Sequence, residues 1–114
     1  MVACLCAAWC RSCEAYRAVF EATRQTAGAG ARWLWVDIEE HAQWFGDLDI
    51  ETFPTLLVVG PEGVCFFGPL RPHAQALQQV VERAMQGRLP RLGDVAVRRL
   101  ASALTEWTVA SPDR

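Results

Sequence analysis

Short runs of apolar residues recur along the chain and predict the strands of a β-sheet. Residues 2–7 are uniformly apolar and small, and residues 32–38 and 55–59 are rich in β-branched and aromatic side chains. A Gly-Pro-Glu-Gly turn at 60–63 joins the third run to a fourth at 64–67, which predicts a hairpin. Uniformly apolar runs are typical of strands buried on both faces, so we expect helices on both sides of the sheet.

Helical spacing separates these runs, beginning with a long helix from about residue 10 to about residue 27. Tyr16 and Phe20 lie on one face of this helix, and Gly28 and Gly30 are expected to end it. Because the helix connects the first two strands, those strands should pair in parallel through a right-handed crossover. The hairpin adds antiparallel pairing, so the α/β sheet is expected to be mixed.

Three further helices are expected. A short one covers residues 39–45, with Ala42 and Phe45 facing inward, and another is opened by Pro72, because proline is tolerated in the first turn. The last begins after Asp94, a good N-cap residue. Its apolar face consists of Val97, Leu100, Leu104 and Trp107. This face is expected to pack either on the rest of the chain or against a second copy, which would give a homodimer.

The 114 residues are enough for one domain with a substantial core. We divide them into a domain at 1–87 and a segment at 88–114, which is a linker followed by the amphipathic helix. Hydrophobic residues make up 52% of the chain, which excludes a disordered protein, and the net charge of −2 argues against a nucleic-acid partner. The longest uncharged apolar run, residues 1–10, is about half the length of a membrane span. We therefore expect no membrane association and predict a cytoplasmic protein.

Cysteine provides the main chemical signal, because four of the five cysteines lie within the first 13 residues. They are Cys4, Cys6, Cys10 and Cys13, and the fifth is Cys65. A disulfide-stapled secreted domain would carry an even number of cysteines spread along a shorter chain. Crowding of thiols at one place instead indicates redox chemistry or metal binding.

Metal binding is the weaker of these two interpretations. Four thiolates are enough for zinc or an iron–sulfur cluster, but the Cys-x-Cys-x₃-Cys-x₂-Cys spacing fits no familiar ligand pattern. His41 and His73 are far from the cysteines in sequence and are interpreted as surface or capping residues. We therefore predict no metal site, and no organic cofactor, because two sulfur atoms can carry the electrons themselves.

The segment Trp9-Cys10-Arg11-Ser12-Cys13 lies where the first strand leads into the first helix. Two cysteines three residues apart on a first helical turn can form a disulfide with little backbone movement. Cys10 lies near the unpaired N–H groups and the positive end of the helix dipole, which lower the pKa of its thiol, and the charge of Arg11 acts in the same direction. We therefore expect Cys10 to attack a substrate disulfide and Cys13, one turn deeper, to resolve the mixed disulfide.

Together with two later features, this segment resembles the thioredoxin family over the whole first domain. Trp9 directly precedes the cysteine pair, a strand ends near Asp37, and Phe53-Pro54-Thr55 is similar to the cis-proline loop of the family. The resemblance implies a thioredoxin-like fold, disulfide exchange at the two cysteines, and a cis peptide bond before Pro54, with that proline facing the sulfurs. It also implies that backbone groups around Phe53 pair with the substrate chain.

The sequence also departs from the family pattern. A strand and a helix usually precede the active-site strand, and here the sequence opens directly on that strand. Cys4 occupies the position of a buried carboxylate, Trp33 that of its lysine partner, and Arg11-Ser12 replaces the usual Gly-Pro. Without that carboxylate, the proton of Cys13 must pass to Cys4 or to water. Arg11 is expected to make the couple more oxidising than a couple with Gly-Pro.

Several residues are candidates for substrate binding because they would form a largely apolar rim around Cys10, where an extended chain could dock. They are Trp9, Arg11, Phe53, Pro54 and Gly68, and Phe53 is equally well interpreted as a core residue.

Three other cysteines lie outside the Cys10–Cys13 pair. Cys4 and Cys6 share one face of the first strand and can point toward the active-site side. They are interpreted either as small core residues or as auxiliary thiols that take part in disulfide exchange. Cys65 is expected to pack in the core, as are Trp33 and Trp35.

The first function predicted from these features is a thiol–disulfide oxidoreductase that acts on protein disulfides or dithiols and needs a recycling reductase. The alternative is a non-catalytic thioredoxin-like adaptor or assembly chaperone that binds a protein partner through the rim and the last helix. A Cys13→Ser variant distinguishes the two, because an adaptor would trap no mixed disulfides.

Overall fold

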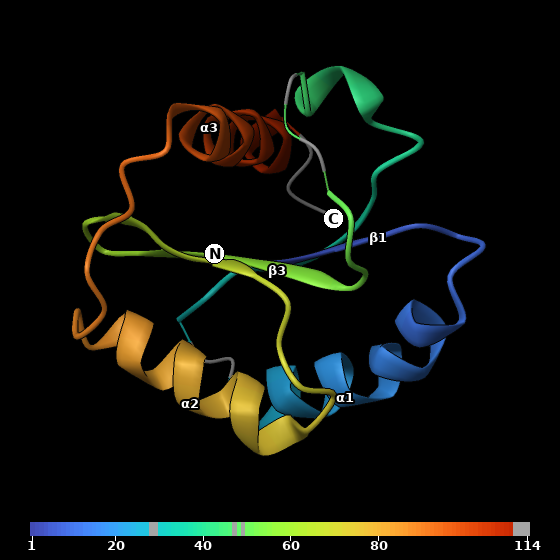
Figure 1. Cartoon of the computed structure of the whole chain (residues 1–114). Helices are drawn as coiled ribbons and strands as arrows, with labels where there is room; N and C mark the ends of the chain where they lie inside the picture. The colour runs from blue at the N-terminus through green and yellow to red at the C-terminus, as the bar shows by residue number, and fades with distance from the viewer. Residues whose placement is uncertain (28–29, 47, 49, 111–114) are drawn as a thin grey trace.

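Four strands form one sheet in the order β2-β1-β3-β4, as the computed structural model shows (Figure 1). It describes residues 1–27, 30–46, 48 and 50–110. The central strand β1 (Val2–Cys6) pairs in parallel with β2 (Trp33–Asp37) and antiparallel with β3 (Thr55–Gly60). The hairpin partner β4 (Gly63–Gly68) closes the other edge, so the predicted mixed sheet is confirmed.

Helices cover both faces of this sheet (Figure 1). On one face lie α1 (Arg11–Ala27) and α2 (Ala74–Met85). On the other lie α3 (Val95–Ala110) and the single 3₁₀ turn η1 (Ala42–Trp44). Within the described residues, no helix combines the length and the apolar character that crossing a membrane requires.

Alternate residues of β1 divide between two hydrophobic cores. Val2, Cys4 and Cys6 belong to the core under α1 and α2, whereas Ala3 and Leu5 belong to the core under α3. All five are at most 2% exposed, because successive side chains of a strand point to opposite faces and both faces are covered. This explains why the strand is uniformly apolar in sequence.

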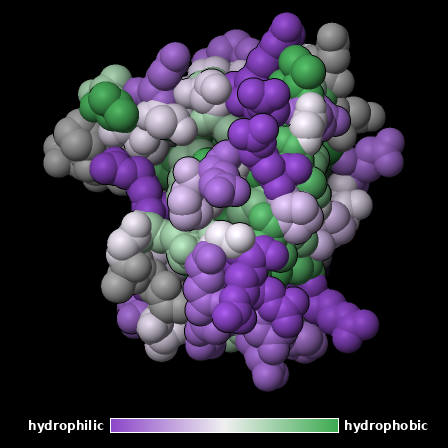
Figure 2. All heavy atoms as spheres, turned by 90° about the vertical axis from the view of Figure 1, so that its left-hand side faces the viewer, coloured by the Kyte–Doolittle hydropathy of each residue, from purple (hydrophilic) through white to green (hydrophobic). Residues whose placement is uncertain are grey.

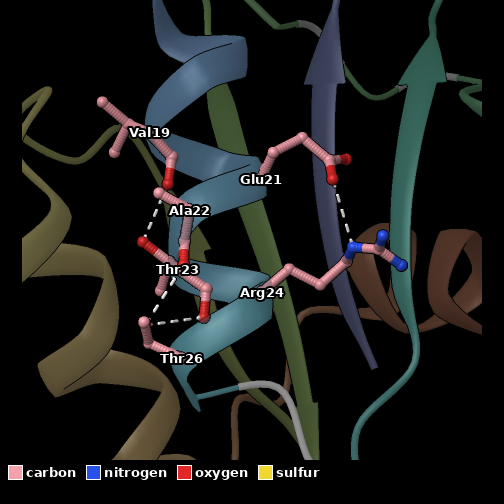
Figure 3. Close-up of polar contacts among 6 residues, drawn as sticks. All are labelled: Val19, Glu21, Ala22, Thr23, Arg24 and Thr26. Atoms are coloured by element: carbon pink, nitrogen blue, oxygen red, sulfur yellow. Dashed lines mark hydrogen bonds and ion pairs between the residues drawn. The ribbon is translucent and has the colours of Figure 1, made fainter.

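Helix α1 keeps its polar side chains paired with its own backbone near its C-terminal end (Figure 3). The buried Thr23 hydroxyl donates to the carbonyl oxygen of Val19 at 2.8 Å, which satisfies a polar group that is only 1% exposed. On the exposed side, Arg24 Nε lies 3.2 Å from a carboxylate oxygen of Glu21. The helix ends at Ala27 as predicted, but Gly28, one of the two glycines expected to end it, lies outside the described residues.

The helix predicted over residues 39–45 is wrong in extent, since only the turn η1 forms. Ala42, predicted to face inward, is exposed, whereas Trp44 and Phe45 are half-buried against the core under α3. The His41 ring stacks on the Trp44 ring with centroids 4.0 Å apart, and both rings contact Trp107 of α3. Packing between aromatic rings, and not helical periodicity, therefore determines the path of this segment.

The start of α2 also differs from the prediction. Pro72 precedes the helix, which begins at Ala74, because His73 has an extended backbone with φ of −126° and ψ of 135°.

The linker between α2 and α3 crosses one edge of the sheet, where hydrophilic side chains cover much of the surface and hydrophobic atoms show between them (Figure 2). The amide of Leu92 donates to the carbonyl oxygen of Val64 at 2.7 Å and so holds the linker against β4. Asp94 then caps α3 as predicted, because its Oδ1 atom accepts from the Val97 amide at 3.1 Å. Leu100 and Leu104 are fully buried, so α3 packs its apolar face on the sheet of its own chain.

Candidate dithiol site

Cys10 lies at the N-cap of α1, directly after the turn that follows β1. Its amide donates to the carbonyl oxygen of Ala7 at 3.0 Å, and its own carbonyl oxygen accepts the first helical bond, from the Glu14 amide at 3.2 Å. The amides of the first helical turn have no partner within the helix and are available to a group at the N-cap. The chain therefore places a half-buried thiol at a cluster of N–H donors.

These donors favour the ionised form of Cys10. The backbone amide of Cys13 is the main group that lowers the pKa of the Cys10 thiol, and the Cys13 thiol and the Ser12 amide act in the same direction. Burial opposes them without cancelling them. Arg11 is exposed, and its predicted contribution to this pKa stays a prediction.

Cys13 has the opposite character, although it lies on the same helical turn. Its side chain is 2% exposed, and burial raises the pKa of its thiol, with a further rise from a hydrogen bond to the Cys6 thiol. At neutral pH one thiol of the pair is thus held protonated while its neighbour is made more acidic. A pair with this asymmetry can attack a disulfide with one sulfur and release the product with the other.

Aromatic side chains border the dithiol. Trp9 is 68% exposed, and its ring meets the ring of Phe53 edge to face with centroids 5.7 Å apart. This contact brings the loop before β3 to the start of α1, and the peptide bond between Phe53 and Pro54 is cis. Two of the predicted rim residues, Trp9 and Phe53, are therefore in contact with each other at the start of α1, where Trp9 directly precedes Cys10.

Gly68, another predicted rim residue, borders a separate hollow of about 310 Å³ at the start of β3. Ile50, Glu51 and Thr52 line the same hollow, and sequence reasoning did not identify them. The sequence signal that could have identified them is their position just before Phe53, because binding residues concentrate on loops and a loop usually provides more than two of them.

The thiol next to Cys13 is one of the two that the sequence offered as auxiliary thiols. Cys4 and Cys6 share a face of β1 as predicted, with sulfur atoms 3.5 Å apart, but it is Cys6 whose thiol interacts with Cys13. Cys4, which was expected to accept the proton of Cys13, contacts Cys6 instead. Strand alternation predicted the shared face, whereas the contact with α1 depends on how the helix packs.

The remaining core predictions are confirmed. Cys65 is buried, and its thiol lies 3.6 Å from the carbonyl oxygen of Val58. Trp33 and Trp35 are half-buried, and both rings pack edge-on against Phe20, with centroids 5.2 and 5.6 Å away. In the part of the chain that the structure describes, no group of three or more histidine, cysteine or acidic side chains is arranged to hold a metal ion.

The sheet order and the cysteine pair at the start of α1 define a thioredoxin-like domain, and comparison with known proteins identifies the family. The family model named Thioredoxin matches residues 1–86. The chain therefore belongs to the thioredoxin family. A comparison with curated protein sequences gives no significant match.

Solved structures with a similar fold share little sequence with the chain. A malarial protein superposes with a TM-score of 0.63 at 14% identity, over 74% of this chain and 94% of that one. Human ERp44 gives 0.60 at 17% identity, over 72% of this chain and 26% of its own, and ERdj5 gives 0.61 at 13%, over 76% and 12%. The chain thus spans only a fraction of the two larger proteins, and these similarities concern the fold alone.

Proposed function

We propose that the protein is a thiol–disulfide oxidoreductase that exchanges disulfides with protein substrates through Cys10 and Cys13. The observation that carries this proposal is the placement of two thiols on one helical turn, with Cys10 half-buried at the N-cap and Cys13 buried, which lowers the pKa of the first and raises that of the second. Membership of the thioredoxin family supports the same reaction class.

The reaction proceeds in two exchanges. The Cys10 thiolate attacks one sulfur of the substrate disulfide, a Cys10–substrate bond forms, and the other substrate sulfur leaves as a thiolate that takes up a proton. Cys13 then loses its proton and attacks the Cys10 sulfur, which releases the second substrate sulfur. The substrate disulfide is reduced to two thiols while the protein dithiol is oxidised, so a reductase must return two electrons and two protons to complete a cycle.

We assign substrate binding to the surface beside Cys10. The exposed Trp9 ring and the Phe53 ring offer an apolar contact next to the nucleophile, and the backbone near Pro54 and Gly68 is suited to an extended chain. Arg11, exposed on the first turn of α1, adds a positive charge for acidic or thiolate groups.

The test combines turnover with trapping. The protein should accelerate the reduction of insulin by dithiothreitol, and Cys13→Ser should accumulate mixed disulfides with protein substrates, because Cys10 can still attack but nothing resolves the product. Cys65→Ser, which alters a buried thiol away from the pair, should trap none. Turnover no faster than dithiothreitol alone, together with an absence of trapped species, would refute the proposal.

A partner-binding adaptor is the second candidate. It is favoured by Cys4, which replaces the carboxylate that the family uses beside its buried cysteine, and by the exposed Trp9, which offers a docking surface whether or not the thiols react. The adaptor hypothesis predicts partner binding that survives alkylation of Cys10, measured by titration with and without iodoacetamide treatment.

A further inference from the structure

Four thiols at the start of α1 and on β1 interact in successive pairs. Cys10 is half-buried at the surface and interacts with Cys13, and Cys13 interacts in turn with Cys6. Cys6 and Cys4 follow, with sulfurs 3.5 Å apart. The proposed function uses only Cys10 and Cys13, which leaves Cys6 beside the reactive pair, and Cys4 beside Cys6, without a role.

Cys6 lies between Cys13 and a hollow at the surface. On one side it meets Cys13, the sulfur shared by any disulfide of the site. On the other it borders a hollow of about 330 Å³ whose lining also includes the charged or polar side chains of Arg17, Asp37, Glu40 and His41. A polar hollow of this size admits a small thiol but not a folded protein. Cys6 thus borders this hollow, although its side chain is only 2% exposed.

We propose that Cys6 is a third redox thiol, which exchanges with Cys13 and moves the disulfide inward from Cys10–Cys13 to Cys6–Cys13. Cys6 loses its proton to water, its sulfur bonds to the Cys13 sulfur, and the bond between Cys13 and Cys10 breaks. Cys10 leaves as a thiolate. No electrons are gained or lost in this step, because one disulfide replaces another. The step rests on the proposed function only in that it begins from the oxidised Cys10–Cys13 pair.

The acidity of the sulfurs sets the direction and the rate of this exchange. Cys10 is the best leaving group of the site, because the backbone amides of the helix start lower its pKa, and a disulfide between two thiols of higher pKa is the harder one to reduce. Cys6 is a slow nucleophile, because its hydrogen bond with Cys4 and its burial raise its pKa. The exchange should therefore accelerate about tenfold per pH unit, in proportion to the Cys6 thiolate fraction.

The functional consequence is that the oxidised protein regains a free Cys10 at its surface. The stored disulfide is then withdrawn from protein partners that dock beside Trp9. Its return to the dithiol form requires two successive exchanges with a small thiol, and the hollow that Cys6 borders is the route that we propose for that thiol.

A Cys10→Ser variant tests whether the inner pair can form. Serine is a good N-cap residue, so this variant should fold. Treatment with diamide, which takes two electrons and two protons from a pair of thiols, should yield one Cys6–Cys13 disulfide, identified by mass spectrometry of peptides. The matched variant Cys10→Ser/Cys65→Ala should form the same disulfide, and Cys10→Ser/Cys6→Ala should form none. A Cys10→Ser protein that keeps these thiols reduced, or that joins Cys4 to Cys6, would overturn the proposal.

The exchange itself is measured in the chain with all five cysteines. After rapid oxidation at pH 7, iodoacetamide should label Cys10 increasingly with time and faster at pH 8, whereas Cys6→Ala should keep Cys10 protected. Constant protection of Cys10 in both proteins would contradict the exchange even if insulin reduction is normal. Conversely, a Cys6–Cys13 disulfide in a protein without insulin reductase activity would remove the proposed function and leave the inner pair intact.

Discussion

The two faces of the sheet are covered by helices in the same way but are filled with different chemistry. Every cysteine of the chain belongs to the core under α1 and α2 or packs against it, together with Tyr16 and Phe20. The buried residues of the core under α3, which we call the aliphatic side of the sheet, are aliphatic without exception. Two buried side-chain nitrogen or oxygen atoms lack a hydrogen-bond partner among the described residues, the Tyr16 hydroxyl and the Trp33 indole nitrogen. Both lie in or against the core under α1 and α2, which we call the cysteine side of the sheet.

The two cores therefore differ in what they contribute: one holds the reactive thiols, and the other stabilises the domain. Unpaired buried polar groups cost stability, so the cysteine side, which holds the two named above, is the poorer source of it. Among the described residues, the aliphatic side has no such groups and supplies stability through burial. Helix α3, which follows the part of the chain matched by the family model, contributes Val97, Leu100 and Leu104 to that side.

The largest effect should come from the cysteine side. Cys10→Ser should lower insulin reduction to background, because no other thiol in the structure has both the exposure and the lowered pKa of a nucleophile. Its free energy of unfolding should stay close to that of the parent protein, since serine also caps the helix. Turnover assays and urea unfolding check the two parts, and residual activity above a tenth of the parent rate would break the assignment.

The second effect, on stability, should come from the aliphatic side. Leu104→Ala removes a fully buried side chain between α3 and the sheet, and should lower the free energy of unfolding by roughly 2–5 kcal/mol. Val95→Ala on the exposed side of the same helix should change it by less than about 0.5 kcal/mol. Both variants should keep the parent rate of Cys10 alkylation at temperatures where they are folded. A changed rate in Leu104→Ala would show that the two faces are coupled.

The third prediction concerns alkaline pH and separates the faces by their ionisable groups. Burial is the main cause that raises the pKa of Cys13 and Cys65, and the hydrogen bond with Cys4 is the main cause at Cys6. Each of these thiols ionises at a lower pH in the unfolded chain than in the folded protein. Their contribution to the free energy of unfolding is therefore fully present below about pH 8.5 and is lost as the pH rises above it. The contribution of Cys10, whose pKa is lowered, has the opposite sign and changes only below that pH.

Reduced protein should therefore lose stability between pH 8.5 and pH 10, by up to about 1.4 kcal/mol per pH unit for each thiol that ionises only on unfolding. Cys6→Ala should flatten this dependence, because one such thiol is gone, whereas Leu104→Ala should shift the whole curve without changing its slope. Urea unfolding in the presence of a phosphine reductant at several pH values measures both. Equal slopes in the parent protein and Cys6→Ala would contradict the assignment of a raised pKa to Cys6.

The pattern of apolar and polar residues was sufficient to predict those elements whose conformation depends on residues close in sequence. The start of α1 at the cysteine pair follows from an apolar strand, a tight turn and N–H donors, all within 13 residues. Long-range packing decided the rest. The segment after β2 follows the stack of His41 on Trp44 against Trp107, a residue of the last helix. Likewise, the contact of Cys6 with Cys13 depends on where α1 lies across the sheet, which periodicity does not specify.

The smallest expected effect tests how firmly the aliphatic side holds α3. Asp94→Ala removes the carboxylate oxygen that accepts from the Val97 amide at 3.1 Å, and should lower the free energy of unfolding by about 1 kcal/mol. Asp94→Asn keeps an oxygen acceptor without the charge, so it should recover most of that loss, and the remainder measures the charge–dipole part. Because the cap lies on the opposite side of the sheet from α1, neither variant should alter the pH at which Cys10 is half-alkylated. An Asp94→Ala variant with the stability of the parent would mean that the packing of Leu100 and Leu104 alone anchors α3, and that the cap contributes only to where the helix begins.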